Sequence, residues 1–341
     1  MKRNNSIEAF RFLFICVICL WHFNGVTTFI KHGYIAVEFF FIVSGFYLYR
    51  AYKKHSDIGT LDYTLHKVKK FLPPFIISFV LLLLLDREQY IYPPSNITPD
   101  AVLSKYFVHL HELFFCQGIG FTDRVAVNHP LWFISILLFS GGILYSLLRN
   151  YNQKAISLII PVLTVLGFNY MLMNGNHSLA PFCSSFIPGL NTGIVRGITE
   201  MGLGILTAYI FERKIDTISQ HIRVINMGGV ISATGYVLMI FANDNYDYLA
   251  LVFIPIIIIS CNLPDSLFQK KLSWGIFGWL GSLSMYMYFI HLFVAYIFWI
   301  WLNHFGTPNI ILVVAYLISV IIVSYTLKIL SDKFSSLLSP K

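Results

Sequence analysis

Charged side chains are scarce in this chain. Of its 341 residues, only 12% are Asp, Glu, Lys or Arg, whereas 57% are hydrophobic. Soluble domains carry about 25% charged residues, so the composition excludes an ordinary soluble enzyme and indicates a polytopic membrane protein. The formal net charge of +8 would also suit nucleic-acid binding, but the distribution of the basic residues favours membrane topology and no nucleic-acid partner.

Linkers, disulfide patterns and repeats are lacking as well. No Gly/Ser-rich or charged linker separates a second domain, so residues 1–341 are predicted to form one integral-membrane domain. The spacing of the five cysteines does not support a disulfide framework. No internal repeat or inverted pair of broken spans is present, which disfavours a secondary transporter.

The first apolar run, 7–29, follows two basic residues as a signal peptide would. It is too long for one and has no small-residue cleavage site, so we expect it to remain as the first membrane span. A spanning helix needs about 20 apolar residues, and hydropathy predicts an all-α bundle of about ten such helices. Segment 101–118 is interrupted by charged and histidine residues and is expected to be interfacial or re-entrant. The spans lie near 7–29, 34–52, 71–90, 131–148, 155–173, 192–211, 224–241, 248–262, 276–301 and 309–330.

The basic residues predict the orientation of the bundle. With ten spans and a cytoplasmic N-terminus, most of the 24 Lys and Arg residues fall on inside segments. Only Lys31, Arg87, Lys105 and Arg124 fall outside, which follows the positive-inside rule. We therefore expect both termini in the cytoplasm and a multi-pass protein of the cytoplasmic or plasma membrane, in contact with its lipids.

Polar residues inside the first span are candidate functional residues, because a charge within a membrane is costly. Eleven residues at about 100° each bring Arg11 and His22 onto one helix face, roughly 16 Å apart. That face carries a cation near the cytoplasmic surface and a titratable base in the outer half of the membrane. A local ion pair between Arg11 and Glu8 is the structural alternative.

Glu38 in the second span is expected to lie near the depth of His22. A carboxylate beside an imidazole orients it and raises its basicity, so His22 and Glu38 are the predicted catalytic pair. Two structural alternatives remain open. His22 would form only a helix–helix hydrogen bond, or Glu38 would pair with Arg196 of the sixth span.

Lys67 and Lys70 belong to a basic cluster at the cytoplasmic entrance of the third span. Three residues apart on a helix, they would face one ligand together and could hold phosphates as point charges. Such clusters also serve as topology signals or as contacts to anionic lipids.

Further polar or aromatic residues converge at a similar depth. By topology, Trp132, Arg196 and His291 fall in the outer half or middle of the membrane, as do His22 and Glu38. Individually, an interfacial Trp or an ion pair between Arg196 and Glu200 four residues on needs no function. Their convergence favours a shared site.

The order of these motifs resembles that of the membrane acyltransferase-3 family of O-acyltransferases, in the form without a fused extracytoplasmic domain. The likeness runs nearly end to end. This chain departs from the family pattern at Glu38, where an Asp is usual, and at Lys67 and Lys70, which replace two arginines and lose their bidentate geometry. The matching motifs are Arg11 with His22, the run GYIAVEFFFIVSGF at 33–46, Lys67-x-x-Lys70 before Pro73, Leu131-Trp132-Phe133, Arg196 with Glu200 to Gly204, and Ser284 with Tyr288 and His291.

The resemblance implies transfer of an acyl group, typically acetyl, from cytoplasmic acetyl-CoA to a hydroxyl of an envelope glycan or lipid-linked sugar. By this likeness Arg11, Lys67 and Lys70 hold the coenzyme A phosphates, and His22 is the general base or, alternatively, a transient acyl carrier. Acyl-CoA is a substrate here, and neither a resident cofactor nor a metal is expected. The oxyanion donor would be one of four residues: Trp132, Arg196, Tyr288 or His291. The alternative function is export of a glycan or lipid-linked envelope intermediate through the same polar interior.

Overall fold

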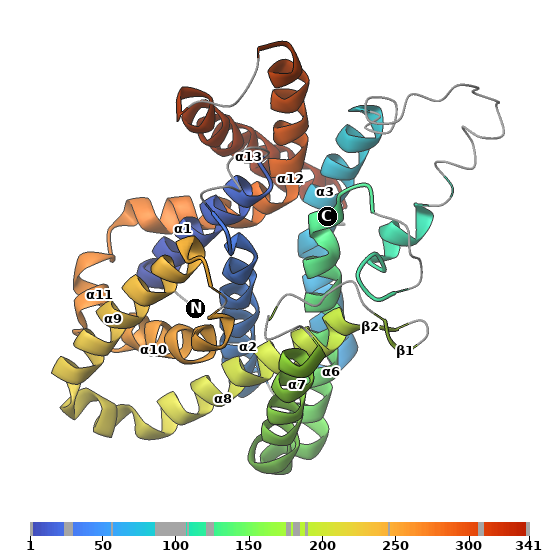
Figure 1. Cartoon of the computed structure of the whole chain (residues 1–341). Helices are drawn as coiled ribbons and strands as arrows, with labels where there is room; N and C mark the ends of the chain where they lie inside the picture. Colours follow the sequence, from blue (N-terminus) through green and yellow to red (C-terminus); the bar gives the residue numbers. More distant parts are fainter. Residues whose placement is uncertain are drawn as a thin grey trace.

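The computed structural model describes residues 3–23, 30–55, 57–85, 107, 109–120, 126–174, 179, 185–187, 190–244, 246–305 and 310–338. Long helices build nearly all of this part of the chain, and a two-stranded antiparallel sheet pairs β1 (Ser185–Ile187) with β2 (Leu190–Asn191). Figure 1 shows α1 and α2 in the middle of the bundle, with later helices around them. The helices are α1 (Asn5–Trp21), α2 (Ala36–Lys54), α3 (Thr60–Leu85), α6 (Trp132–Lys154), α7 (Ile160–Asn174), α8 (Thr192–Gln220), α9 (Ile222–Phe241), α10 (Ala250–Asn262), α11 (Leu267–Lys271), α12 (Gly275–Phe305) and α13 (Ile310–Leu338).

Seven continuous helical segments of the described residues are long and apolar enough to cross a membrane. One of them, His129–Asn174, contains two of the predicted spans, α6 and α7, joined by the π-helical turn Ala155–Ile159. Asn152 has a left-handed backbone with φ of 43°, which breaks the helical path between the two. The membrane character and the helical fold are confirmed, whereas the predicted count of ten crossings is not.

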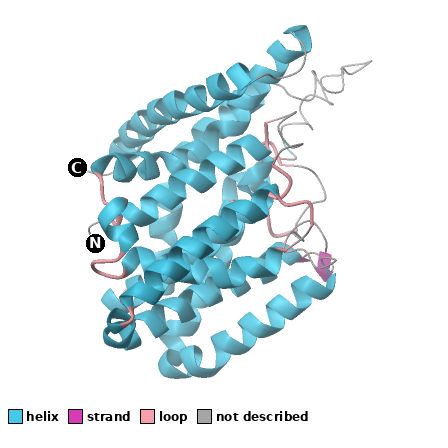
Figure 2. Ribbon diagram, turned by 60° about the vertical axis from the view of Figure 1, so that its left-hand side comes forward, coloured by secondary structure: helices cyan, strands magenta, loops and turns pink. Residues whose placement is uncertain are grey.

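The remaining predicted spans coincide with shorter helices. α1 has 17 residues and α10 has 13, less than the length of a full crossing. The start of α1 and the end of α13 lie at the same end of the bundle (Figure 2), as an even number of crossings requires. Which side of a membrane that end faces stays a prediction, as does the single domain.

Segment 101–118 is described only in part. Residues 101–106 and 108 lie outside the described residues, and the rest contains a short 3-10 helix, Leu110–Phe114. Phe114 is 77% exposed and Leu110 is 46% exposed. These exposed apolar side chains agree with the expected interfacial placement.

Small residues allow α2 and α8 to approach each other backbone to backbone. A Cβ added at Gly45 would lie 1.9 Å from the carbonyl oxygen of Met201, and one added at Gly204 would lie 2.0 Å from that of Ile42. Neither distance admits a side chain, so both positions require glycine. Close approach at small residues is how helices associate in membranes, and it explains two of the glycine-containing motifs read from the sequence.

We expect Gly204→Ala to destabilise the bundle, because its methyl group would overlap the backbone of α2. Overpacking of this kind costs about 1–3 kcal/mol or more. The thermal midpoint and the monodisperse yield of the detergent-purified protein measure the effect. Gly275→Ala is the matched control, since a Cβ there would meet nothing within 4 Å, and equal stability of the two variants would contradict the close contact.

Candidate active site

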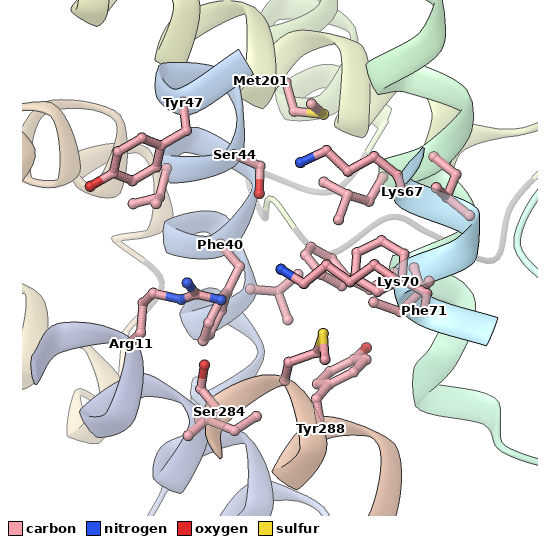
Figure 3. A pocket seen from close by; sticks show the side chains of 18 of the residues that line it. Arg11, Phe40, Ser44, Tyr47, Lys67, Lys70, Phe71, Met201, Ser284 and Tyr288 are labelled. Carbon is pink, nitrogen blue, oxygen red and sulfur yellow. The ribbon is translucent and has the colours of Figure 1, made fainter. Parts of the chain in front are cut away.

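A cavity of about 230 Å³ lies between α1, α2, α3, α6 and α12. Three cationic side chains enter it from two sides. Arg11 reaches in from α1, and Lys67 and Lys70 point toward it from α3 (Figure 3). The structure therefore brings the three predicted phosphate-binding residues to one cavity.

Arg11 is held by its neighbour on the same helix. Its Nη1 lies 3.2 Å from Oε1 of Glu8, and 31% of the Arg11 side chain is exposed. The local ion pair proposed as a structural alternative is thus present. Arg11 still lines the cavity, so the ion pair orients the guanidinium without removing it from the cavity.

His22 caps the C-terminal end of α1, one turn beyond the cavity-lining Ile18. Its Nδ1 lies 2.9 Å from the carbonyl oxygen of Ile18. A carbonyl can only accept, so Nδ1 carries the hydrogen and Nε2 of the neutral ring carries the lone pair. This is the tautomer that a general base acting through Nε2 requires.

Two more imidazoles adjoin His22. The ring of His291, from α12, lies 5.1 Å away between centroids, and that of His129 lies 5.6 Å away. Tyr288, which lines the cavity, is 5.8 Å from His291 between ring centroids and donates its hydroxyl hydrogen to the carbonyl of Pro130. A group of three histidines therefore lies next to the cavity-lining residues Ile18 and Tyr288. No set of described His, Cys, Asp or Glu residues has a metal-binding arrangement.

Glu38 contacts Arg196, the alternative that the sequence left open. Its Oε1 lies 2.5 Å from Nη2 of Arg196, and Oε1 of Glu200 lies 2.8 Å from Nε. All three side chains are at most 1% exposed. Among the described residues no hydrogen bond or ion pair joins Glu38 to His22, so the predicted pairing of the two is wrong and the Ile18 carbonyl orients the imidazole instead.

Trp132 belongs to this second polar group. The guanidinium of Arg196 lies 5.4 Å from the centre of the Trp132 ring, a cation–π contact. Together Glu38, Trp132, Arg196 and Glu200 tie α2, α6 and α8 to one another. Their contacts describe a structural group, and none of the four lines the cavity.

The sequence of this chain is also similar to those of known proteins. A family model described as an acyltransferase domain matches residues 4–329. The chain belongs to this acyltransferase family. The match covers both the cavity and the histidine group, and it confirms the resemblance drawn from the motifs.

One curated relative of this acyltransferase is the peptidoglycan O-acetyltransferase OatA of Listeria monocytogenes serovar 1/2a. The two are 21% identical over 316 residues, which cover 84% of this chain and 48% of OatA. The chain thus spans about half the length of the relative that it matches. No solved structure matches it.

His129 is the member of the histidine group that the sequence analysis did not identify. It lies in the short helix His129–Leu131 before α6, outside the predicted spans. The cost of a polar group in the membrane therefore did not single it out. The Val127 N–H, two residues before His129, donates to buried Glu112 over 3.0 Å. This tertiary contact, and the one between the His129 and His22 rings, could be recognised only in three dimensions.

We expect Arg196→Leu to destabilise the acyltransferase strongly, because it leaves two buried carboxylates without their cation. Removing one partner of a buried ion pair costs about 3–5 kcal/mol, which the thermal midpoint of the purified protein would report. Lys270→Leu serves as control, since its pair with Asp265 is mostly exposed and such pairs contribute little. A wild-type midpoint for Arg196→Leu would contradict the structural role.

Proposed function

We propose that the protein is a membrane O-acyltransferase of the cytoplasmic membrane. It moves an acetyl or other short acyl group from cytoplasmic acyl-CoA to a hydroxyl of a cell-envelope or exopolysaccharide sugar. The observation that carries this proposal is one cavity lined by three cations, with His22 one helical turn beyond its lining residue Ile18. The name of the relative OatA, a peptidoglycan O-acetyltransferase, supports an envelope glycan as acceptor.

The cavity suits the shape of an acyl-CoA. Coenzyme A has a phosphorylated head and a long thin arm, and Arg11, Lys67 and Lys70 would bind the phosphates by charge. Arg11 and His22 are about 16 Å apart along α1, so the arm would run beside that helix toward the imidazole. Ser284, whose buried Oγ has no hydrogen-bond partner among the described residues, lines the same cavity and would bind an amide of the arm.

In this mechanism His22 is the general base. Its Nε2 accepts the proton of the sugar hydroxyl as the hydroxyl oxygen attacks the thioester carbonyl. The new C–O bond forms, the C–S bond breaks, and the leaving thiolate takes up the proton, so no net proton is consumed. A direct transfer of this kind needs no acyl-enzyme intermediate.

The hydrogen bonds already present bear on which candidate residue could be the oxyanion donor. Tyr288 already donates its hydroxyl hydrogen to Pro130, and Nε and Nη2 of Arg196 are bound to two carboxylates. The Tyr288 hydroxyl would have to exchange partners before it could bind a developing negative charge, whereas three of the five N–H groups of Arg196 are not used by these two bonds. Ser284 lies two turns of α12 from His291 and is assigned to the arm, not to the oxyanion.

His22→Ala is expected to abolish acyl transfer while the protein still inserts and purifies normally, because no other group replaces the base. Mass spectrometry of envelope glycans from cells carrying each variant, together with acetyl transfer from acetyl-CoA by purified protein, measures the loss. His66→Ala, an exposed histidine on α3, is the control. Full activity of His22→Ala would refute the mechanism, and glycan flux without acetyl transfer by wild type would favour an exporter.

The double substitution of Lys67 and Lys70 by Ala is expected to raise KM for acetyl-CoA by about 100-fold or more, with a smaller change in kcat. Hydrogen bonds to charged groups contribute roughly 1.5–3 kcal/mol each, and this binding persists in the transition state. Steady-state kinetics with varied acetyl-CoA provides the measurement. Lys69→Ala, which removes an exposed lysine that does not line the cavity, should leave KM unchanged, and an equal effect of all three lysines would indicate mere surface charge.

A further inference from the structure

His291 carries a buried acceptor that has no partner. The residue is fully buried in α12, and its Nδ1 lies 2.8 Å from the carbonyl oxygen of Tyr288 and 3.2 Å from that of Met287. Carbonyls only accept, so Nδ1 carries the hydrogen and Nε2 of the neutral ring has none. No described group bonds to Nε2.

An orphan acceptor of this kind is costly. Leaving a buried polar atom without a hydrogen bond costs about 1–3 kcal/mol, so each case in a native structure calls for an explanation. It also means that neutral His291 cannot donate to an oxyanion, because its only N–H is bound to the α12 backbone. The expected role of His291 as an oxyanion donor therefore does not fit its hydrogen bonds.

The nearest ring is that of the base, His22, 5.1 Å away between centroids. An N–H···N hydrogen bond of about 2.9 Å, with roughly 1.1 Å from each ring centre to its nitrogen, spans that same separation. In the resting state both Nε2 atoms lack a hydrogen, so neither ring can donate to the other. One proton delivered to His22 changes this.

Both rings are held in place by their surroundings. The Tyr316 hydroxyl, from α13, lies 3.2 Å from the carbonyl oxygen of Cys19 on α1 and 3.3 Å from that of His291 on α12. Phe23, directly after His22, stacks on the Tyr316 ring at 4.2 Å between centroids. The backbones that carry the two imidazoles are therefore tied through one buried tyrosine.

We propose that His291 is the proton-sharing partner of His22. When Nε2 of His22 takes the proton of the acceptor hydroxyl, the new N–H is shared in a three-centre hydrogen bond between the hydroxyl oxygen and Nε2 of His291, which until then has had no partner. The hydroxyl O–H bond is broken, the proton rests between the two rings, and it leaves with the coenzyme A thiolate as the C–S bond breaks. His291 thus stabilises the protonated base, the role that the sequence assigned to Glu38.

This inference rests on the proposed acyltransferase function, and the test separates the two. The acetyl-transfer assay is run with purified full-length wild type, His291→Leu and His291→Gln. The amide oxygen of Gln can accept a hydrogen bond near the place of Nε2, whereas Leu has no acceptor. Ile290→Leu, a buried neighbour on the same turn, controls for disturbance of the core, and thermal midpoints are recorded for all variants.

We expect His291→Leu to lower kcat by about 10- to 100-fold with KM for acetyl-CoA within twofold of wild type. His291→Gln should recover most of that loss, and Ile290→Leu should be as active as wild type. If His291→Leu does not fold, His291→Asn takes its place, because the shorter amide does not reach the position of Nε2. Unchanged kcat in the Leu variant, equal loss in Gln and in Leu or Asn, or a loss confined to KM would overturn the proposal. Absence of acetyl transfer by wild type would instead overturn the proposed function.

Discussion

A polar side chain in the apolar interior of this bundle must find a partner within the protein, because neither lipid nor the packed core replaces the hydrogen bonds of water. Arg196 satisfies this constraint with two carboxylates and the face of an indole ring. The Glu38–Arg196 ion pair joins α2 to α8, the two helices whose backbones already approach each other at Gly45 and Gly204. The rest of the structure depends on this crossing, since α2 also supplies one wall of the cavity.

Two residues of α12 near the proposed site do not meet this constraint. Ser284 and His291, two turns apart on α12, each keep a buried polar atom without a partner in the described part of the chain. Ser284 lines the cavity and His291 adjoins His22. These unpaired atoms are the basis for the roles proposed for Ser284 and His291.

Two helices, α1 and α12, carry most of the residues proposed for the site. α1 carries Arg11 and His22 on one face, and α12 carries Ser284, Tyr288 and His291 at spacings of four and three residues along a facing stripe. They pack closely because Gly281 of α12 admits the backbone of α1, where an added Cβ would lie 2.4 Å from Cβ of Glu8. The proposed base and its proposed proton-sharing partner face each other at this single helix–helix contact.

Much of this arrangement follows from local sequence. Low charge and long apolar runs determine a membrane helix bundle, since the cost of burying charge acts on every segment alone. Helical periodicity determines that Arg11 and His22 share a face, and that Lys67 and Lys70 can meet one ligand. The family could likewise be read from the spacing of a few motifs.

What the sequence could not determine is which partner each polar group takes. Glu38 lies within plausible depth of both His22 and Arg196, and depth alone does not distinguish them. Glu38 pairs with Arg196 because the α2–α8 crossing brings their side chains to 2.5 Å from each other. His129 joins His22 for a similar reason, through the packing of residues 126–131 against α12, where Asn128 donates to the carbonyl of Phe289. Only tertiary structure decides contacts between residues so distant in the chain, because they depend on how rigid helices pack and not on the preferences of either segment.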